Sequence, residues 1–214
     1  MIPVKYSEVV RYLGYGGMQP DAAVDRAIIR CIEELQQEAQ PKSIYKMFSL
    51  VLPAPGLLDI AGVTIHSSNL SRNLTGCRGA YLMAATLGVA VDRRITRAAV
   101  ACMSDAVIYQ AVAAAMIEAY CDTVNDEIRM EAQKSGLYCR PRFSPGYGDF
   151  SVAHQQDFAR LLDTPRRIGL TVTESSLLAP MKSVTAVIGL SDTPQPCHRA
   201  GCEACEKTDC AFRR

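Results

Sequence analysis

The residues best suited to chemistry lie in a segment rich in proline and glycine at positions 140–149, with the sequence RPRFSPGYGD. Its two prolines and two glycines are incompatible with a regular helix or strand, so we expect a preformed loop over residues 143–148. A rigid loop with free backbone N–H groups beside Arg142 suits an anionic group such as a carboxylate or a phosphate, and Tyr147 offers a flat face for a ring. A tight turn with a surface arginine fits the same residues, and the segment by itself leaves both interpretations open.

A second candidate for chemistry is a cluster of four of the nine cysteines near the end of the chain, namely Cys197, Cys202, Cys205 and Cys210. Four thiolates at these spacings can complete a tetrahedral zinc site or hold an iron–sulfur cluster. Paired or free thiols are the alternative. The remaining cysteines are scattered through apolar segments and are expected to be reduced core residues. The odd total and the absence of an export signal argue against a disulfide framework.

The elements that must position these residues follow one another in a mixed order, without a repeating strand–helix–strand alternation. We expect helices at residues 21–37, 89–136 and 152–162, with a break in the second near Ser104 and Asp105, where either residue can cap a new helix and Asp105 is taken as a cap and not as a site residue. A short helix starts at Ser67 or Ser68 and ends near Gly76. Strands are expected at residues 43–53, 57–66, 78–87, 168–173 and 183–190. This order predicts an α+β fold with an antiparallel sheet over residues 1–190, followed by a cysteine-rich tail at residues 191–214.

Composition excludes several classes of protein. The formal net charge is +1 and no basic stripe with interleaved aromatic residues occurs, so binding to nucleic acid or to an anionic membrane is not expected. The apolar stretch at residues 98–120 is long enough to cross a bilayer, but it contains Asp105, Gln110 and Glu118, which are costly in lipid. We therefore expect a buried helix in a soluble, cytoplasmic protein.

Several short motifs carry a resemblance to a known family. The loop Arg142-Phe-Ser-Pro-Gly-Tyr147 is followed by TESSLLAP at residues 173–180 and SVT at residues 183–185, and RYLGYGG at residues 11–17 and AATLG at residues 84–88 precede it. In content and order these motifs resemble the activation domain of cobalamin-dependent methionine synthase, whose loop reads R-x-x-P-G-Y. The likeness covers residues 11–190, and the chain resembles a stand-alone form of that domain.

The resemblance implies a specific activity. The activation domain binds S-adenosylmethionine (SAM) and caps a separate domain that carries cobalamin. An electron donor such as flavodoxin or ferredoxin reduces inactive cob(II)alamin, and the SAM sulfonium then methylates the cob(I)alamin. Both steps depend on positioning and charge complementarity more than on a protein nucleophile. The expected cofactors are SAM and the cobalamin of a partner, which is a methionine synthase or another corrinoid protein.

The resemblance also assigns residues. Arg142 matches the arginine that suits the methionyl carboxylate of SAM. Ser144, Gly146 and Tyr147 match loop positions that offer backbone polar groups and a ring to the ligand. Glu118 matches a glutamate near the charged end of the ligand, and a solvated helix residue is the alternative. Pro145 and Glu174 are expected to organise loops.

Departures from the family leave alternatives open. After Ala186-Val-Ile-Gly-Leu190 the tail differs from that of the family, so one wall of the SAM site is either missing or supplied by a partner. No D-x-H-x-x-G cobalamin-binding motif occurs, so cobalamin must come from the partner. The alternatives are a metal- or iron–sulfur-bearing redox partner of another corrinoid methyltransferase, or a docking scaffold without chemistry. The glycine-rich turn of a doubly wound SAM methyltransferase is not seen.

Overall fold

The computed structural model describes residues 1–16 and 18–194, which form a mixed helix-and-sheet fold. The helices are α1 (Tyr6–Tyr12), α2 (Ala22–Glu38), α3 (Ser68–Asn73), α4 (Val89–Ala101), α5 (Met103–Lys134), α6 (Gln155–Leu162) and α7 (Thr164–Ile168), with a 3-10 turn η1 (Val152–His154). The strands are β1 (Lys42–Ala54), β2 (Leu57–Ile60), β3 (Val63–His66), β4 (Cys77–Thr86), β5 (Tyr138–Cys139), β6 (Thr171–Val172), β7 (Leu178–Ala179) and β8 (Ser183–Ser191).

The main sheet is antiparallel and has the strand order β3-β2-β1-β4-β8-β5. The two long central pairs are β1 with β4, from Lys42↔Thr86 to Ser49↔Gly79, and β4 with β8. Alternate residues of β4 enter two different hydrophobic clusters, with Met83 in one and Leu82 in the other. Both faces of the sheet are therefore covered, and the expected α+β fold with an antiparallel sheet is confirmed.

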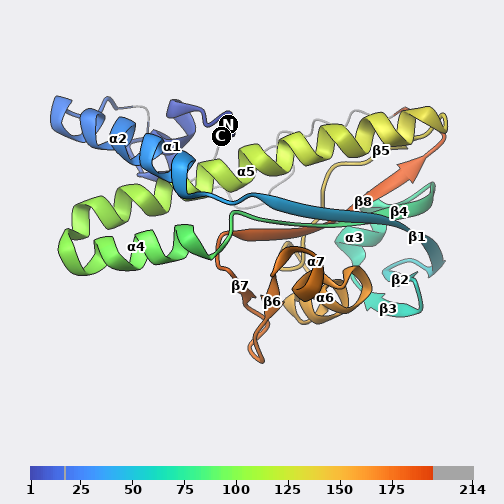
Figure 1. Cartoon of the computed structure of the whole chain (residues 1–214). Coiled ribbons are helices and arrows are strands. Elements are labelled where there is room, and N and C mark those ends of the chain that lie inside the picture. The colour runs from blue at the N-terminus through green and yellow to red at the C-terminus, as the bar shows by residue number, and fades with distance from the viewer. Residues whose placement is uncertain (17, 195–214) are drawn as a thin grey trace.

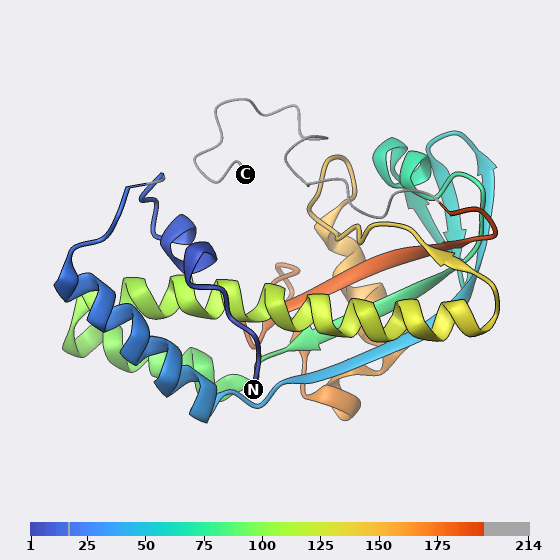
Figure 2. The ribbon, with the colours of Figure 1, turned by 90° about the horizontal axis from the view of Figure 1, so that it is seen from above.

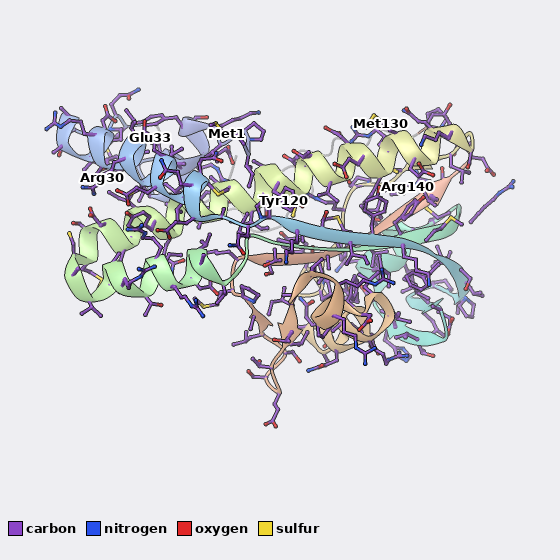
Figure 3. All side chains as sticks on the ribbon, in the orientation of Figure 1. Met1, Arg30, Glu33, Tyr120, Met130 and Arg140 are labelled. Carbon is purple, nitrogen blue, oxygen red and sulfur yellow. The ribbon has the colours of Figure 1, made fainter. Side chains whose placement is uncertain are left out.

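Helix α5 covers one face of the sheet and helices α6 and α7 cover the other (Figure 1). The N-terminal half of α5 packs against α1, α2 and α4, while its C-terminal half lies over β4 and β8. The small residues Ala111, Ala113 and Ala115 are almost completely buried and allow this close packing. In Figure 3, Tyr120 points from α5 toward β1, where its hydroxyl donates to the Ser43 hydroxyl at 3.1 Å.

The long helical region differs in one detail from the prediction. The break lies at Cys102, whose backbone is extended, and not at Ser104 and Asp105. Asp105 does not cap α5: its carboxylate lies 2.7 Å from the Arg30 guanidinium of α2. Figure 3 places Arg30 at the end of the molecule opposite to Arg140. The ion pair between helices explains why an acidic residue stands in the first turn.

Three other segments refine or correct the predicted elements. Residues 57–66 form the β2–β3 hairpin, which turns at Ala61 and Gly62, where one bent strand was expected. The predicted strand at residues 168–173 is mostly wrong: α7 ends at Ile168 and only Thr171 and Val172 are in a strand. Helix α1 was not predicted, and its Val9 is fully buried against the α5 side of the core. In the part of the chain that the structure describes, no helix is both long and apolar enough to cross a membrane.

Candidate functional site

The proline- and glycine-rich loop follows β5, the strand at one edge of the main sheet. It leaves β5, and Phe143 then makes a two-way backbone bridge to Val187 of β8, with N–O distances of 2.9 and 2.8 Å. Pro145 is buried, and the following Gly146 has a φ of +98°. A Pro-Gly pair with positive φ at the glycine suits a tight turn, and the turn is closed by the Tyr147 N–H, which donates to the Ser144 carbonyl at 3.1 Å. The predicted preformed loop agrees with this geometry, and the organising role of Pro145 stays a prediction.

The backbone donors of this loop are not all free, contrary to expectation. The Gly146 N–H donates to the Phe150 carbonyl at 2.7 Å, and the Tyr147 N–H is used in the turn itself. The Pro-Gly turn accounts for the Tyr147 N–H, whereas the Gly146 N–H is satisfied by the carbonyl of Phe150, at the other end of the loop. Gly146 and Ser144 therefore shape the loop, and the guanidinium of Arg142 reaches the carboxylates of α5.

Asp149 fixes the far end of the loop to helix α3. Its carboxylate accepts hydrogen bonds from the Ser67 hydroxyl, from the Ser68 N–H at 2.7 Å and from the Asn69 N–H at 3.1 Å. The Ser67 hydrogen bond first of all, and then the backbone donors, lower the pKa of Asp149. Gly148 packs so closely on α3 that a Cβ there would lie 2.4 Å from the side-chain nitrogen Nδ2 of Asn69. The loop is thus held at both ends.

Arg142 lies between two carboxylates of α5. Its Nη2 is 3.3 Å from Glu118 Oε2 and 2.9 Å from Asp122 Oδ1. Its Nη1 is buried without a hydrogen-bond partner. The structure therefore brings together Arg142 and Glu118, which are far apart in the sequence, and adds Asp122, which the sequence analysis missed. Asp122 stands four residues after Glu118, and this spacing on a helix was the available signal.

Tyr147 completes the cluster from the loop side. The residue is 59% exposed, so its ring is open to a ligand or a partner. Partial desolvation of the hydroxyl and then the Glu118 carboxylate raise the pKa of Tyr147, and the Tyr12 hydroxyl of α1 acts in the same direction. Helix α1 and the loop lie along the same side of α5 (Figure 2). Cys121 of α5 is fully buried, and desolvation raises its pKa to about 12.

Glu174 does not join this cluster. It stands in the exposed turn between β6 and β7, on the side of the sheet opposite to α5 (Figure 1). The hydrogen bonds that hold this turn come from Thr173, whose hydroxyl accepts the Leu177 N–H at 3.0 Å and whose N–H donates to the Leu177 carbonyl at 2.8 Å. In the described chain, the organising residue of the TES motif is therefore its threonine.

Two further features remain to be placed against the sequence analysis. Cys197, Cys202, Cys205 and Cys210 fall outside the described residues, and within residues 1–16 and 18–194 no group of three or more potential metal ligands occurs. A cavity of about 620 Å³ lies between residues 52–56 and the segment from α3 to Gly76. None of the predicted site residues lines this cavity.

Comparison with known proteins places the fold. No family model matches the sequence, and no curated protein matches it either. Among solved structures, the chain is similar to the crystal structure of the MetH reactivation domain bound to AdoHcy, with a TM-score of 0.63 and 14% sequence identity. The match covers 89% of this chain and 71% of that one. The fold is that of a methionine synthase reactivation domain.

Proposed function

We propose that the chain binds SAM beside Arg142 and serves as a reactivation subunit for a cobalamin-dependent methionine synthase. The observation that carries this proposal is the convergence of Arg142, Glu118 and Tyr147 from two distant segments, in a fold similar to that of a reactivation domain bound to AdoHcy. The motif order in the sequence supports it independently. The partner is a corrinoid protein, because the chain has no cobalamin-binding motif of its own.

Each residue has a role that follows from its chemistry. The guanidinium of Arg142 binds the methionyl carboxylate, since a planar fork of donors suits a carboxylate. Glu118 faces the positively charged end of SAM. Tyr147 and the loop residues Ser144, Pro145 and Gly146 shape the wall beside the ligand, and the exposed Tyr147 ring is open to the corrinoid partner.

The chemistry needs no nucleophile from this chain. An external donor such as flavodoxin or ferredoxin supplies one electron to cob(II)alamin on the partner. The S–CH₃ bond then breaks with its electron pair left on sulfur, and the cobalt of cob(I)alamin supplies the pair of the new Co–C bond. The protein contributes orientation and charge complementarity, which are large terms when the reactants carry the reactivity themselves.

A spectroscopic reactivation assay tests the proposal. The mixture contains this protein, SAM, a low-potential reductant and a cob(II)alamin-loaded methionine synthase from the same source that lacks its own reactivation domain. We expect the methylcobalamin spectrum only when the protein and SAM are both present. As a control, chemical methylation shows that the cobalamin of the partner can be converted to methylcobalamin. If such a partner stays in the cob(II)alamin form with this protein and SAM, the proposal is wrong.

The cysteine cluster near the end of the chain supports a second candidate function. Cys197, Cys202, Cys205 and Cys210 have spacings that suit zinc or an iron–sulfur cluster, and such a cluster would make the chain a redox or docking partner of a corrinoid methyltransferase. Replacing Cys202 and Cys205 with Ser is expected to release the bound metal, as measured by elemental analysis and visible absorbance. The second candidate function is contradicted if the metal content is the same in the variant and in the wild-type protein. It is also contradicted if the wild-type protein purified without oxygen contains no metal.

A further inference from the structure

Asp122 places a second carboxylate on Arg142, one helical turn after Glu118. Its Oδ1 is 2.9 Å from Arg142 Nη2, closer than the 3.3 Å of Glu118 Oε2. Residues four apart on a helix share a face, so both carboxylates point toward the loop. The Asp122 side chain is 73% exposed and the Glu118 side chain is 37% exposed. One guanidinium held by two carboxylates leaves this cluster with an excess of negative charge.

The arginine retains donor capacity in this arrangement. Both carboxylates contact Nη2, whereas Nη1 is buried without a partner. A buried donor without an acceptor is unfavourable, and a ligand carboxylate that reaches Nη1 relieves it. Asp122 therefore orients the guanidinium and adds negative charge without occupying the donor that a ligand needs.

This excess charge matters because SAM and its product differ by one positive charge. SAM carries a carboxylate, an ammonium and a sulfonium, whereas the thioether left after methyl transfer has lost the sulfonium charge. We propose that Asp122 makes the Arg142 cluster discriminate between the sulfonium ligand and its thioether product. This inference rests on the proposed function and names the feature of the ligand that the site selects. It also provides a reason for the spent ligand to leave after each methyl transfer.

The size of the effect follows from Coulomb's law. For an assumed separation of about 6 Å between a unit charge and the sulfonium, an effective dielectric constant of about 40 to 80 corresponds to a change in affinity of about three- to tenfold. The exposure of Asp122 places it in this screened range. Because mobile ions screen exposed charges, the discrimination falls as ionic strength rises.

The test is a titration of the full chain with SAM and with S-adenosylhomocysteine at low and at physiological salt, using Asp122→Asn and a matched control. Asp126→Asn is that control, because Asp126 stands one turn further along α5, is 63% exposed and pairs with Arg129 instead of Arg142. We expect the preference for SAM to fall about three- to tenfold in Asp122→Asn and to stay unchanged in Asp126→Asn. Asp122→Glu restores the charge and the preference. An analogue with an ammonium group in place of the sulfonium should show the same changes in affinity as SAM in each variant.

The outcomes separate this inference from the function on which it rests. An unchanged preference in Asp122→Asn overturns it, and so does an equal loss of affinity for both ligands, since that assigns Asp122 to holding Arg142 alone. If the wild-type chain binds neither ligand, the proposed function fails and this inference fails with it. Circular dichroism of each variant shows that the fold is retained, as expected for an exposed helix residue.

Discussion

The attachment of the loop to helix α3 through Asp149 can be tested by removing one carboxylate. Asp149→Ala deletes the acceptor of three hydrogen bonds, from the Ser67 hydroxyl and from the N–H groups of Ser68 and Asn69. Loss of an acceptor at a helix N-terminus typically costs about 0.5–2 kcal/mol. Asp149 is exposed, so water replaces part of the interaction, but its charge strengthens each bond. We expect the free energy of unfolding to fall by about 1–2 kcal/mol at neutral pH.

The pH dependence of this loss identifies its cause. The pKa of Asp149 is lower in the folded protein than its ordinary value, so the stabilisation is complete well above about pH 4 and is lost as the pH falls through the folded pKa. Urea unfolding of both proteins should therefore show a difference in unfolding free energy at pH 7 that shrinks in acid. Glu131→Ala, which removes only a surface pair with Lys134, should have little effect. Equal stability of Asp149→Ala and wild type at pH 7, or a difference that persists in acid, would refute the reasoning.

Two further predictions concern Arg142 and the cysteines Cys102 and Cys121. Arg142→Ala should lower the affinity for SAM about tenfold to a hundredfold, because it removes charge-assisted hydrogen bonds to the ligand carboxylate. The circular dichroism spectrum should stay unchanged. An unaltered affinity in a calorimetric titration would remove Arg142 from the site. Cys102 is exposed and the Ser104 hydroxyl lowers its pKa, whereas Cys121 is fully buried and desolvation raises its pKa to about 12. Iodoacetamide should therefore modify Cys102 before Cys121 under native conditions. Peptide mapping by mass spectrometry checks this order, and equal rates would contradict the burial of Cys121.

The long elements of the fold were predictable because their hydrophobic patterns are long. The helix expected at residues 21–37 is α2, and Asp21 caps it through the N–H groups of Ala23 and Val24. The strand expected at residues 78–87 is β4, which is buried on both faces. Short elements depend on tertiary contacts instead. Helix α1 has only 7 residues and is held by the burial of Val9, and no local pattern reveals that contact.

The same distinction applies to the site. Arg142 and Tyr147 were proposed because a Pro-Gly turn has a strong local signature and because the family resemblance includes them, and Glu118 came from that resemblance alone. Asp122 was missed because its role depends on which face of α5 meets the loop, and that follows from the packing of distant segments. The expectation of free N–H groups in the loop was wrong for Gly146 and Tyr147, because Gly146 donates to the Phe150 carbonyl and Tyr147 to the Ser144 carbonyl once the loop has folded.

The most direct test of the central claim follows the methyl group itself. The reactivation mixture is supplied with SAM whose transferable methyl group carries deuterium, and the cobalamin is then extracted from the partner and analysed by mass spectrometry. The proposed function predicts deuterated methylcobalamin with the wild-type chain and a large loss of it with Arg142→Ala. Unlabelled methylcobalamin, or the same labelled yield when the chain is omitted, would contradict it.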